Sequence, residues 1–207
     1  MAKILHINAS PMGDLAYSIR AARVFLDAYR SANPQDIMEE RDLWQADLPD
    51  FDFTAASGKY KVMRGLDHTE EEARAWRVVI KTIEQLKAAD KVVVSTGMWN
   101  FSIPYRLKQY IDIVVQPGLT FSYDPEKGYT GLVTGKKLQL ILASGGEYPA
   151  GSPMVAYDFQ KPYLETIFGF IGFTDIRAIR VEGTLSPAAS DNLEIAKESL
   201  AKAARQF

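Results

Sequence analysis

The sequence predicts an α/β protein in which helices cover both faces of a parallel sheet, as a single domain over residues 1–207. Three consecutive valines at residues 92–94 are typical of a strand that is covered on both faces. Apolar residues recur at helical spacing between such runs. No linker, repeat or low-complexity stretch divides the chain, and its 207 residues suit one large domain, since domains average roughly 150 residues.

The predicted elements alternate between strand and helix. The expected strands are residues 3–8, 36–44, 91–95, 137–143 and 176–181. The expected helices carry apolar stripes that run from Ile19 to Tyr29, Trp76 to Leu86, Leu107 to Val115, Tyr163 to Phe168 and Leu193 to Leu200. A capping box from Thr69 to Glu72 marks the start of the second helix.

Three segments differ from the buried strands and apolar-striped helices of the rest of the chain. Charged side chains in residues 36–44 place that strand at an edge of the sheet. Residues 49–68 show no clear period and are expected to wrap the surface. Residues 121–128 are expected to form a hairpin or an irregular excursion.

The composition excludes several classes of function. The formal net charge is −2, which argues against nonspecific nucleic-acid binding. The chain has no cysteine and only two histidines, which excludes thiol nucleophiles, iron–sulfur clusters and Cys- or His-rich metal sites. No apolar run is long enough for a signal peptide or a membrane span. We therefore expect a cytoplasmic protein with no bound metal and no nucleic-acid or membrane partner.

Ligands of such sheets bind outside the carboxyl ends of the strands, where loops 9–18, 96–104 and 143–148 are expected. The first loop places Ser10 and Ser18 at the start of a helix, whose free amides and partial positive charge suit a phosphate. The same serines also fit ordinary turn and cap positions.

The other two loops suit a flat ring. Residues 98–101 put two aromatic side chains and a carboxamide in a loop, and Gly145 and Gly146 let the backbone approach a ligand closely. Each loop also has a purely structural interpretation, because Trp99 and Phe101 suit packing under the next helix and the glycines suit a strand-ending turn. Taken together, the three loops predict a mononucleotide cofactor.

The ionisable side chains give weaker candidates. His6 lies inside the first strand among apolar neighbours and is expected in the core, and His68 is expected in solvent. The run from Glu70 to Glu72 suits the start of a helix and does not require a metal.

Several motifs together point to one family. They are Ser10 with Tyr17-Ser18, residues 98–108 (MWNFSIPYRLK), residues 118–123 (GLTFSY), residues 131–137 (GLVTGKK), Gly145-Gly146 and residues 169–175 (GFIGFTD). From residue 3 to about residue 183, the chain resembles the FMN-dependent NADH-azoreductases and quinone reductases of the flavodoxin-like superfamily.

The resemblance implies a flavodoxin-like, doubly wound, five-stranded parallel sheet of order 2-1-3-4-5, and a homodimer with FMN at the dimer interface. The residues that would bind the FMN phosphate are Ser10, Ala16, Tyr17 and Ser18. Those that would line the ring are Met98, Trp99, Asn100 and Phe101, with Asn100 tuning it. Those that would cover its other edge are Ala143, Ser144, Gly145 and Gly146. Phe121 and Tyr123 would contact the substrate.

The resemblance also implies a reaction. NADH would pass a hydride to the flavin and leave, and a quinone or an azo compound would then accept two electrons on the same face, in a ping-pong sequence. Cleavage of an aromatic azo compound to amines would take two such rounds. The flavin carries this chemistry, so no side chain is expected to act as a catalytic acid, base or nucleophile.

The chain departs from the family pattern at two places. Residues 143–146 read Ala-Ser-Gly-Gly where members often have Ser-Arg-Gly-Gly, and residues 116–118 read Gln-Pro-Gly where they often have Arg-Ala-Gly. The missing arginines bear on substrate range and on the choice between NADH and NADPH. FMN binding does not rest on them.

Three alternatives stay open from the sequence. The first two are a flavodoxin-type electron carrier and a general NAD(P)H-dependent FMN reductase. A mild pI of 5.8 and the aromatic hairpin argue against the carrier. The third is a regulatory module that binds no flavin, such as a receiver domain, but Asp14 has no obvious acidic companions after the first strand.

Overall fold

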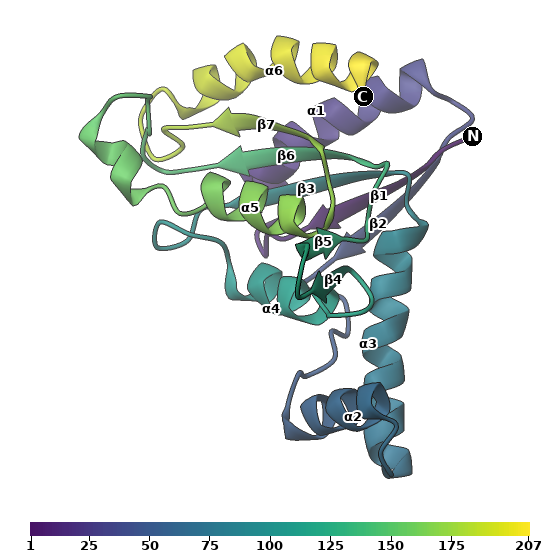
Figure 1. Cartoon of the computed structure of the whole chain (residues 1–207). Coiled ribbons are helices and arrows are strands. Elements are labelled where there is room, and N and C mark those ends of the chain that lie inside the picture. Colours follow the sequence, from purple (N-terminus) through teal and green to yellow (C-terminus); the bar gives the residue numbers. More distant parts are fainter.

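The computed structural model describes residues 1–207 and contains one five-stranded parallel sheet with the strand order β2-β1-β3-β6-β7 (Figure 1). Its strands are β1 (Lys3–Asn8), β2 (Ile37–Asp42), β3 (Lys91–Gly97), β6 (Lys137–Ala143) and β7 (Asp175–Val181). The two other strands, β4 (Phe121–Asp124) and β5 (Gly128–Gly131), form a separate antiparallel hairpin. Without the hairpin the order is 2-1-3-4-5, which confirms the predicted fold, and β2 is an edge strand as expected.

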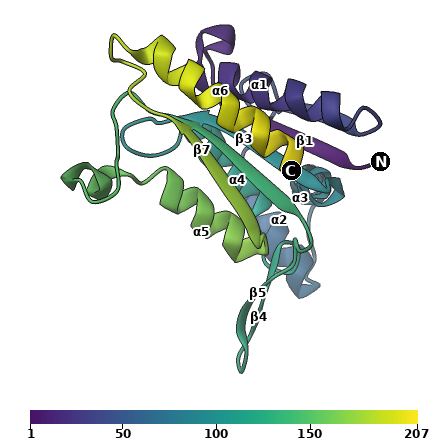
Figure 2. The ribbon, with the colours of Figure 1, turned by 90° about the horizontal axis from the view of Figure 1, so that it is seen from above.

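Helices cover both faces of the sheet. They are α1 (Tyr17–Ala32), α2 (Phe53–Arg64), α3 (Glu70–Ala88), α4 (Tyr105–Val114), α5 (Lys161–Ile171) and α6 (Ala189–Gln206). In Figure 2, α1 and α6 lie on one face, and α3, α4 and α5 lie on the other. Val93 belongs to the core beneath α1 and α6, whereas Val92 and Val94 belong to the core beneath α3, α4 and α5. The valine run is therefore covered on both faces, as predicted. None of the helices combines the length and the apolar composition needed to cross a membrane.

The strand register brings the carboxyl ends of four strands to one edge of the sheet. Asn8 pairs with Ser95, Gly97 with Ala143, and Ala143 with Val181. Because the strands are parallel, the turns that follow β1, β3, β6 and β7 lie side by side at this carboxyl edge.

The hairpin lies at the opposite, amino edge of the sheet. The ring of Phe121 packs on that of Phe170, with centroids 4.7 Å apart, near the end of α5 and shortly before β7 begins. Gly131 must be glycine, because a Cβ there would lie 2.4 Å from the backbone nitrogen of Gly172. Tyr123 extends the aromatic cluster of the hairpin into solvent.

Residues 49–68 contain a helix, α2, that their lack of a clear period does not predict. The helix packs along the first part of α3, and the two project from the body of the molecule (Figure 1). Its ends carry ordinary signals, since the Asp52 carboxylate accepts from the Ala55 amide at 2.9 Å and Gly65 ends the helix with a φ of 64°. The helix shows no apolar period because it buries only Ala55 and Gly58.

Glu72 joins α3 to α2. Its carboxylate accepts hydrogen bonds from the Lys61 ammonium at 2.8 Å, the Ser57 hydroxyl at 2.6 Å and the Thr69 amide at 2.9 Å. The Thr69 hydroxyl in turn accepts from the Glu72 amide at 3.1 Å, so the predicted capping box is confirmed. These donors, led by Lys61, stabilise the carboxylate and lower the pKa of Glu72 from 4.5 to about 2.

We expect Glu72→Gln to destabilise the protein at neutral pH and to have little effect in strong acid. The pKa of Glu72 is depressed in the fold, so its carboxylate stabilises the folded state fully above pH 4.5 and loses this effect as the pH falls towards about 2. Urea unfolding at a series of pH values measures the difference in unfolding free energy between wild type and variant, which should shrink over that range. Glu84→Gln, a change at an exposed glutamate of α3, is the control. The same pH dependence in both variants would contradict the assignment.

Candidate functional site

The turns at the carboxyl edge of the sheet enclose a cavity of about 400 Å³. Turns after β1, β3, β6 and β7 all contribute to it. The predicted site residues that line it are Ser10, Ala16, Tyr17, Ser18, Met98, Trp99, Ala143, Ser144 and Gly145. All three predicted loops are therefore represented around a single cavity.

The first turn brings unpaired hydrogen-bond donors to the cavity. The Ser10 amide donates to Asn8 Oδ1 at 3.2 Å, which turns the chain out of β1. No side chain caps α1, and no acidic residue lies in its first turn, which begins at Tyr17. Ser18 is 1% exposed, and its hydroxyl has no partner in the protein. An uncapped helix start with an unpaired hydroxyl suits an anion such as a phosphate.

The second turn is strained. Asn100 has a φ of 46° and Phe101 a φ of 67°, in the left-handed region. Asparagine tolerates this region, but a bulky residue there costs about 1–3 kcal/mol. Phe101 is held from outside the turn, because its carbonyl accepts from the Phe159 amide at 2.9 Å and its ring centroid lies 5.3 Å from that of Tyr157. Strained turns of this kind concentrate at ligand sites.

The third turn is tied to the segment after β7. The Ser144 carbonyl accepts from the Thr184 amide at 3.0 Å and from its hydroxyl at 3.1 Å. The Ser144 hydroxyl donates to the Gly146 carbonyl at 2.9 Å. A Cβ at Gly145 would lie 2.7 Å from Leu185 Cδ1. Glycine at this position therefore lets the two segments meet and leaves the backbone open to the cavity.

Three predicted ring contacts, Asn100, Phe101 and Gly146, do not line this cavity. Asn100 lines a second cavity, of about 590 Å³, and Trp99 lines both cavities. Phe101 is 45% exposed on the outside of its turn.

The two predicted substrate contacts are also elsewhere in this chain. Phe121 and Tyr123 belong to the hairpin at the amino edge of the sheet, whereas the cavity lies at the carboxyl edge.

Five residues that were not predicted complete the lining. They are Met12, Leu15, Gly97, Thr184 and Leu185. Thr184 and Leu185 follow β7, and the rule that ligands bind at carboxyl strand ends covers this fourth turn as well as the other three. Met12 and Leu15 belong to the first turn and present exposed apolar side chains at the mouth of the cavity.

The lining contains no Asp, Glu, His, Lys or Arg, so it offers no acid–base pair. One cluster elsewhere has the order of a nucleophile, a base and an acid, since His6 Nε2 lies 2.8 Å from Ser95 Oγ and Nδ1 lies 3.9 Å from the Glu40 carboxylate. Ser95 is fully buried, and burial lowers the pKa of His6, so this contact belongs to the core, where His6 was predicted. The cavity thus suits the binding of a phosphate and a flat group that brings its own chemistry.

Comparison with known proteins identifies the family. A family model described as a flavodoxin-like fold matches residues 2–204. The FMN-dependent NADH:quinone oxidoreductase of Nitratidesulfovibrio vulgaris is 51% identical over 186 residues, which cover 90% of this chain and 88% of that protein. The chain belongs to the FMN-dependent NADH:quinone oxidoreductase family.

Solved structures agree with this assignment. The crystal structure of an azoreductase from Bacillus anthracis strain Sterne has a TM-score of 0.93 and 35% identity, with full coverage of both chains. An FMN-dependent NADH-azoreductase from Bacillus anthracis strain Ames Ancestor, solved in complex with FMN, has a TM-score of 0.92 and 30% identity over 100% of this chain and 99% of that one. The family resemblance predicted from the motifs is therefore confirmed.

Removing the Ser18 hydroxyl should not destabilise the ligand-free protein. The hydroxyl is buried without a partner, so Ser18→Ala should leave the unfolding free energy unchanged or raise it slightly. Thr120→Val is the contrasting control, because the Thr120 hydroxyl donates to the Val114 carbonyl and accepts from the Gln116 amide, both at 2.9 Å. Its loss should cost about 1–3 kcal/mol. Equal losses in the two variants, measured by urea unfolding, would contradict this interpretation of Ser18.

Proposed function

We propose that this protein is an FMN-dependent NADH:quinone oxidoreductase that also reduces aromatic azo compounds. The observation that carries the proposal is the cavity at the carboxyl edge, where the buried, unpaired Ser18 hydroxyl lies at the uncapped start of α1. FMN has the phosphate that these donors suit and the flat ring that the other turns suit. The names of the similar proteins support the same cofactor and the same classes of substrate.

The phosphate would sit against the first turn. Ser10 and Ser18 would donate through their hydroxyls, and Ala16 and Tyr17 would contribute the backbone that leads into α1. No arginine or lysine is needed, because the helix start supplies both amides and a partial positive charge.

The ring would lie between the second and third turns. Met98 and Trp99 of the second turn, and Ala143, Ser144 and Gly145 of the third, line the cavity and would contact the ring. These turns would bring backbone donors and acceptors to the edge of the ring and would exclude water from its faces. The proposed site keeps Asn100, Phe101 and Gly146. Asn100 and Phe101 come immediately after Trp99 in the second turn, and Gly146 comes immediately after Gly145 in the third.

The chemistry that FMN would supply in this site is the uptake of a hydride from NADH and the transfer of two electrons to an acceptor. The residues of this chain bind and orient the reactants, since the lining carries no group that titrates near neutral pH. Quinones would be reduced in one round, and azo compounds would be cleaved to amines over two. The cytoplasm stays the expected compartment.

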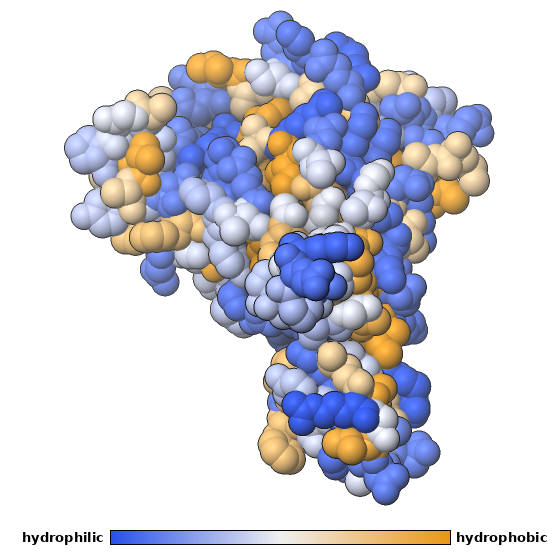
Figure 3. All heavy atoms as spheres, viewed as in Figure 1, coloured by the Kyte–Doolittle hydropathy of each residue, from blue (hydrophilic) through white to orange (hydrophobic).

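A homodimer is part of the proposal. Phe121 and Tyr123 lie at the amino edge, so they reach a cavity at the carboxyl edge only on a second copy of the chain. The projecting α2 also exposes apolar side chains, among them Phe53 and Met63, and Figure 3 shows hydrophobic residues interspersed with hydrophilic ones on this arm. Exposed apolar surface on a projecting arm favours a protein partner.

The purified protein should bind FMN tightly and show the visible spectrum of a flavin. The double variant Ser18→Ala/Asn100→Ala should bind FMN about tenfold to a hundredfold more weakly, because it loses hydrogen bonds to a charged phosphate and to the ring. Ser31→Ala is the matched control, since Ser31 lies in the last turn of α1 and is exposed. A wild-type protein that does not bind FMN would overturn the proposed function. Unchanged FMN affinity in the double variant would overturn the site assignment alone.

Initial rates measured against NADH and a quinone should give parallel double-reciprocal lines. The two substrates are expected to use the same face of the cavity in turn, so the first product leaves before the second substrate binds. Intersecting lines would contradict a shared face. NADH that is not consumed at a steady rate would indicate an electron carrier instead of an enzyme.

A further inference from the structure

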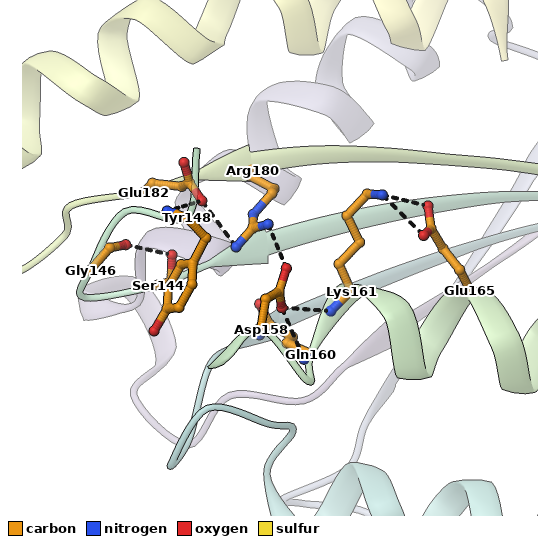
Figure 4. Close-up of polar contacts among 9 residues, drawn as sticks. All are labelled: Ser144, Gly146, Tyr148, Asp158, Gln160, Lys161, Glu165, Arg180 and Glu182. Carbon is orange, nitrogen blue, oxygen red and sulfur yellow. Dashed lines mark hydrogen bonds and ion pairs between the residues drawn. The ribbon is translucent and has the colours of Figure 1, made fainter. Parts of the chain in front are cut away.

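Arg180 contacts one segment that supports the second turn of the cavity and one that supports the third. It is the last residue but one of the edge strand β7, and its side chain is 18% exposed. Figure 4 shows its guanidinium group between the carboxylates of Asp158 and Glu182. Nη1 donates to Asp158 Oδ2 at 2.7 Å, and Nη2 lies 3.0 Å from Glu182 Oε1. The guanidinium group therefore pairs with two carboxylates at once, through a hydrogen bond to Asp158 and through an ion pair with Glu182.

The Asp158 contact leads to the turn after β3. The second oxygen of Asp158 accepts from two backbone amides at the start of α5, at 3.0 and 3.2 Å. The next residue, Phe159, donates its amide to the carbonyl of the left-handed Phe101 at 2.9 Å. Because the Asp158 side chain is 7% exposed, its charge depends on Arg180 for compensation. Arg180 thereby holds the segment that supports the strained turn.

The Glu182 contact leads to the turn after β6. Glu182 Oε1 accepts from the Tyr148 amide at 3.1 Å, and the guanidinium carbon of Arg180 lies 5.3 Å from the centre of the Tyr148 ring. Tyr148 ends the loop in which Ser144 and Gly145 line the cavity. One partly buried side chain is therefore connected, through Asp158 and Glu182, to the segments that support the second and the third turn (Figure 4).

We propose that Arg180 is a positioning residue of the cofactor site, which holds the turn at residues 98–102 and the loop at residues 144–148 at a fixed spacing on either side of the bound ring. Arg180 does not line the cavity and acts through Asp158 and Glu182. The inference rests on the proposed function, because the spacing matters to catalysis only when a ring occupies the cavity. A guanidinium group is required because Nη1 and Nη2 face different carboxylates, whereas a lysine ammonium is a single point charge that serves one carboxylate well.

Hydrogen exchange on the flavin-free protein tests this role without relying on activity. Mass spectrometry of Arg180→Met should show faster exchange in peptides that cover residues 98–104 and 144–160. Arg180→Lys should restore protection in one of these segments only. Arg177→Met is the matched control, because Arg177 lies on the same strand and pairs with Asp175 at 2.8 Å and with α6. Wild-type exchange in both segments of Arg180→Met, or faster exchange confined to residues 158–161, would overturn the proposal.

A second variant keeps the test decisive if Arg180→Met does not fold. Asp158→Asn retains the oxygen that caps α5 and loses the ion pair with Arg180. It should loosen residues 98–104 and leave residues 144–148 protected, because the contact through Glu182 is intact. Unchanged protection of residues 98–104 in Asp158→Asn would overturn the link to the second turn.

Titration with FMN, followed by the quenching of its fluorescence, tests the consequence for the site. Arg180→Met should bind FMN about tenfold more weakly than wild type, and Arg177→Met should bind it equally well. The KM for a quinone should rise by a larger factor than kcat falls, because the reacting groups are intact and only their spacing is relaxed. Equal FMN affinity in Arg180→Met and wild type would overturn the proposal. Wild-type protein that does not bind FMN would overturn the proposed function instead, so the two failures are distinguishable.

Discussion

The strand register, in which Gly97 pairs with Ala143 and Ala143 with Val181, makes β3, β6 and β7 end level at one edge of the sheet. The turns that follow these three strands then face the same space. The helix that follows β1 begins at this edge, so its free amides and its partial positive charge are directed into that space. Position alone thus makes the cavity suitable for an anion, before any side chain is considered.

The lining adds little charge to this arrangement. Apolar side chains, hydroxyl groups and glycines make up the lining, and the ion pairs of the region lie behind the turns, where Arg180 contacts Asp158 and Glu182. Charged groups in this part of the molecule therefore lie outside the cavity lining, and only neutral groups are placed to contact a ligand. Such a division suits a cofactor that supplies its own reactivity, because the protein then needs to control position, water and hydrogen bonding.

Much of the fold could be predicted because apolar residues that are buried in a core recur at regular spacing in the sequence. The valines at 92–94, the apolar stripe of α3 and its capping box all correspond to contacts made within a core or a single helix turn. The helix α2 shows no such regular spacing of apolar residues, since it buries only Ala55 and Gly58 and exposes larger apolar residues. Periodicity reports contact with a core, and α2 contacts mainly one other helix.

The candidate site, like the fold, could be predicted only in part. Which turns meet was predictable, because topology alone brings the carboxyl ends of parallel strands together. The position of each side chain within a turn was not predictable. Asn100, for example, lines the neighbouring cavity. The left-handed backbone at that turn is held by hydrogen bonding and ring packing with residues 157–159, which are distant in the sequence. Local motifs carry no information on a support of this kind.

The conformation of Phe101 also constrains how this sequence can diverge. Glycine at that position would relieve the backbone strain but remove the ring that packs on Tyr157. Loss of Tyr157 alone would leave the strain without its compensating contact. The effect of either change on stability therefore depends on which residue occupies the other position, so the two positions are energetically coupled. During evolution they are expected to covary as a pair, and a homologue that has lost one aromatic ring is expected to have altered the other.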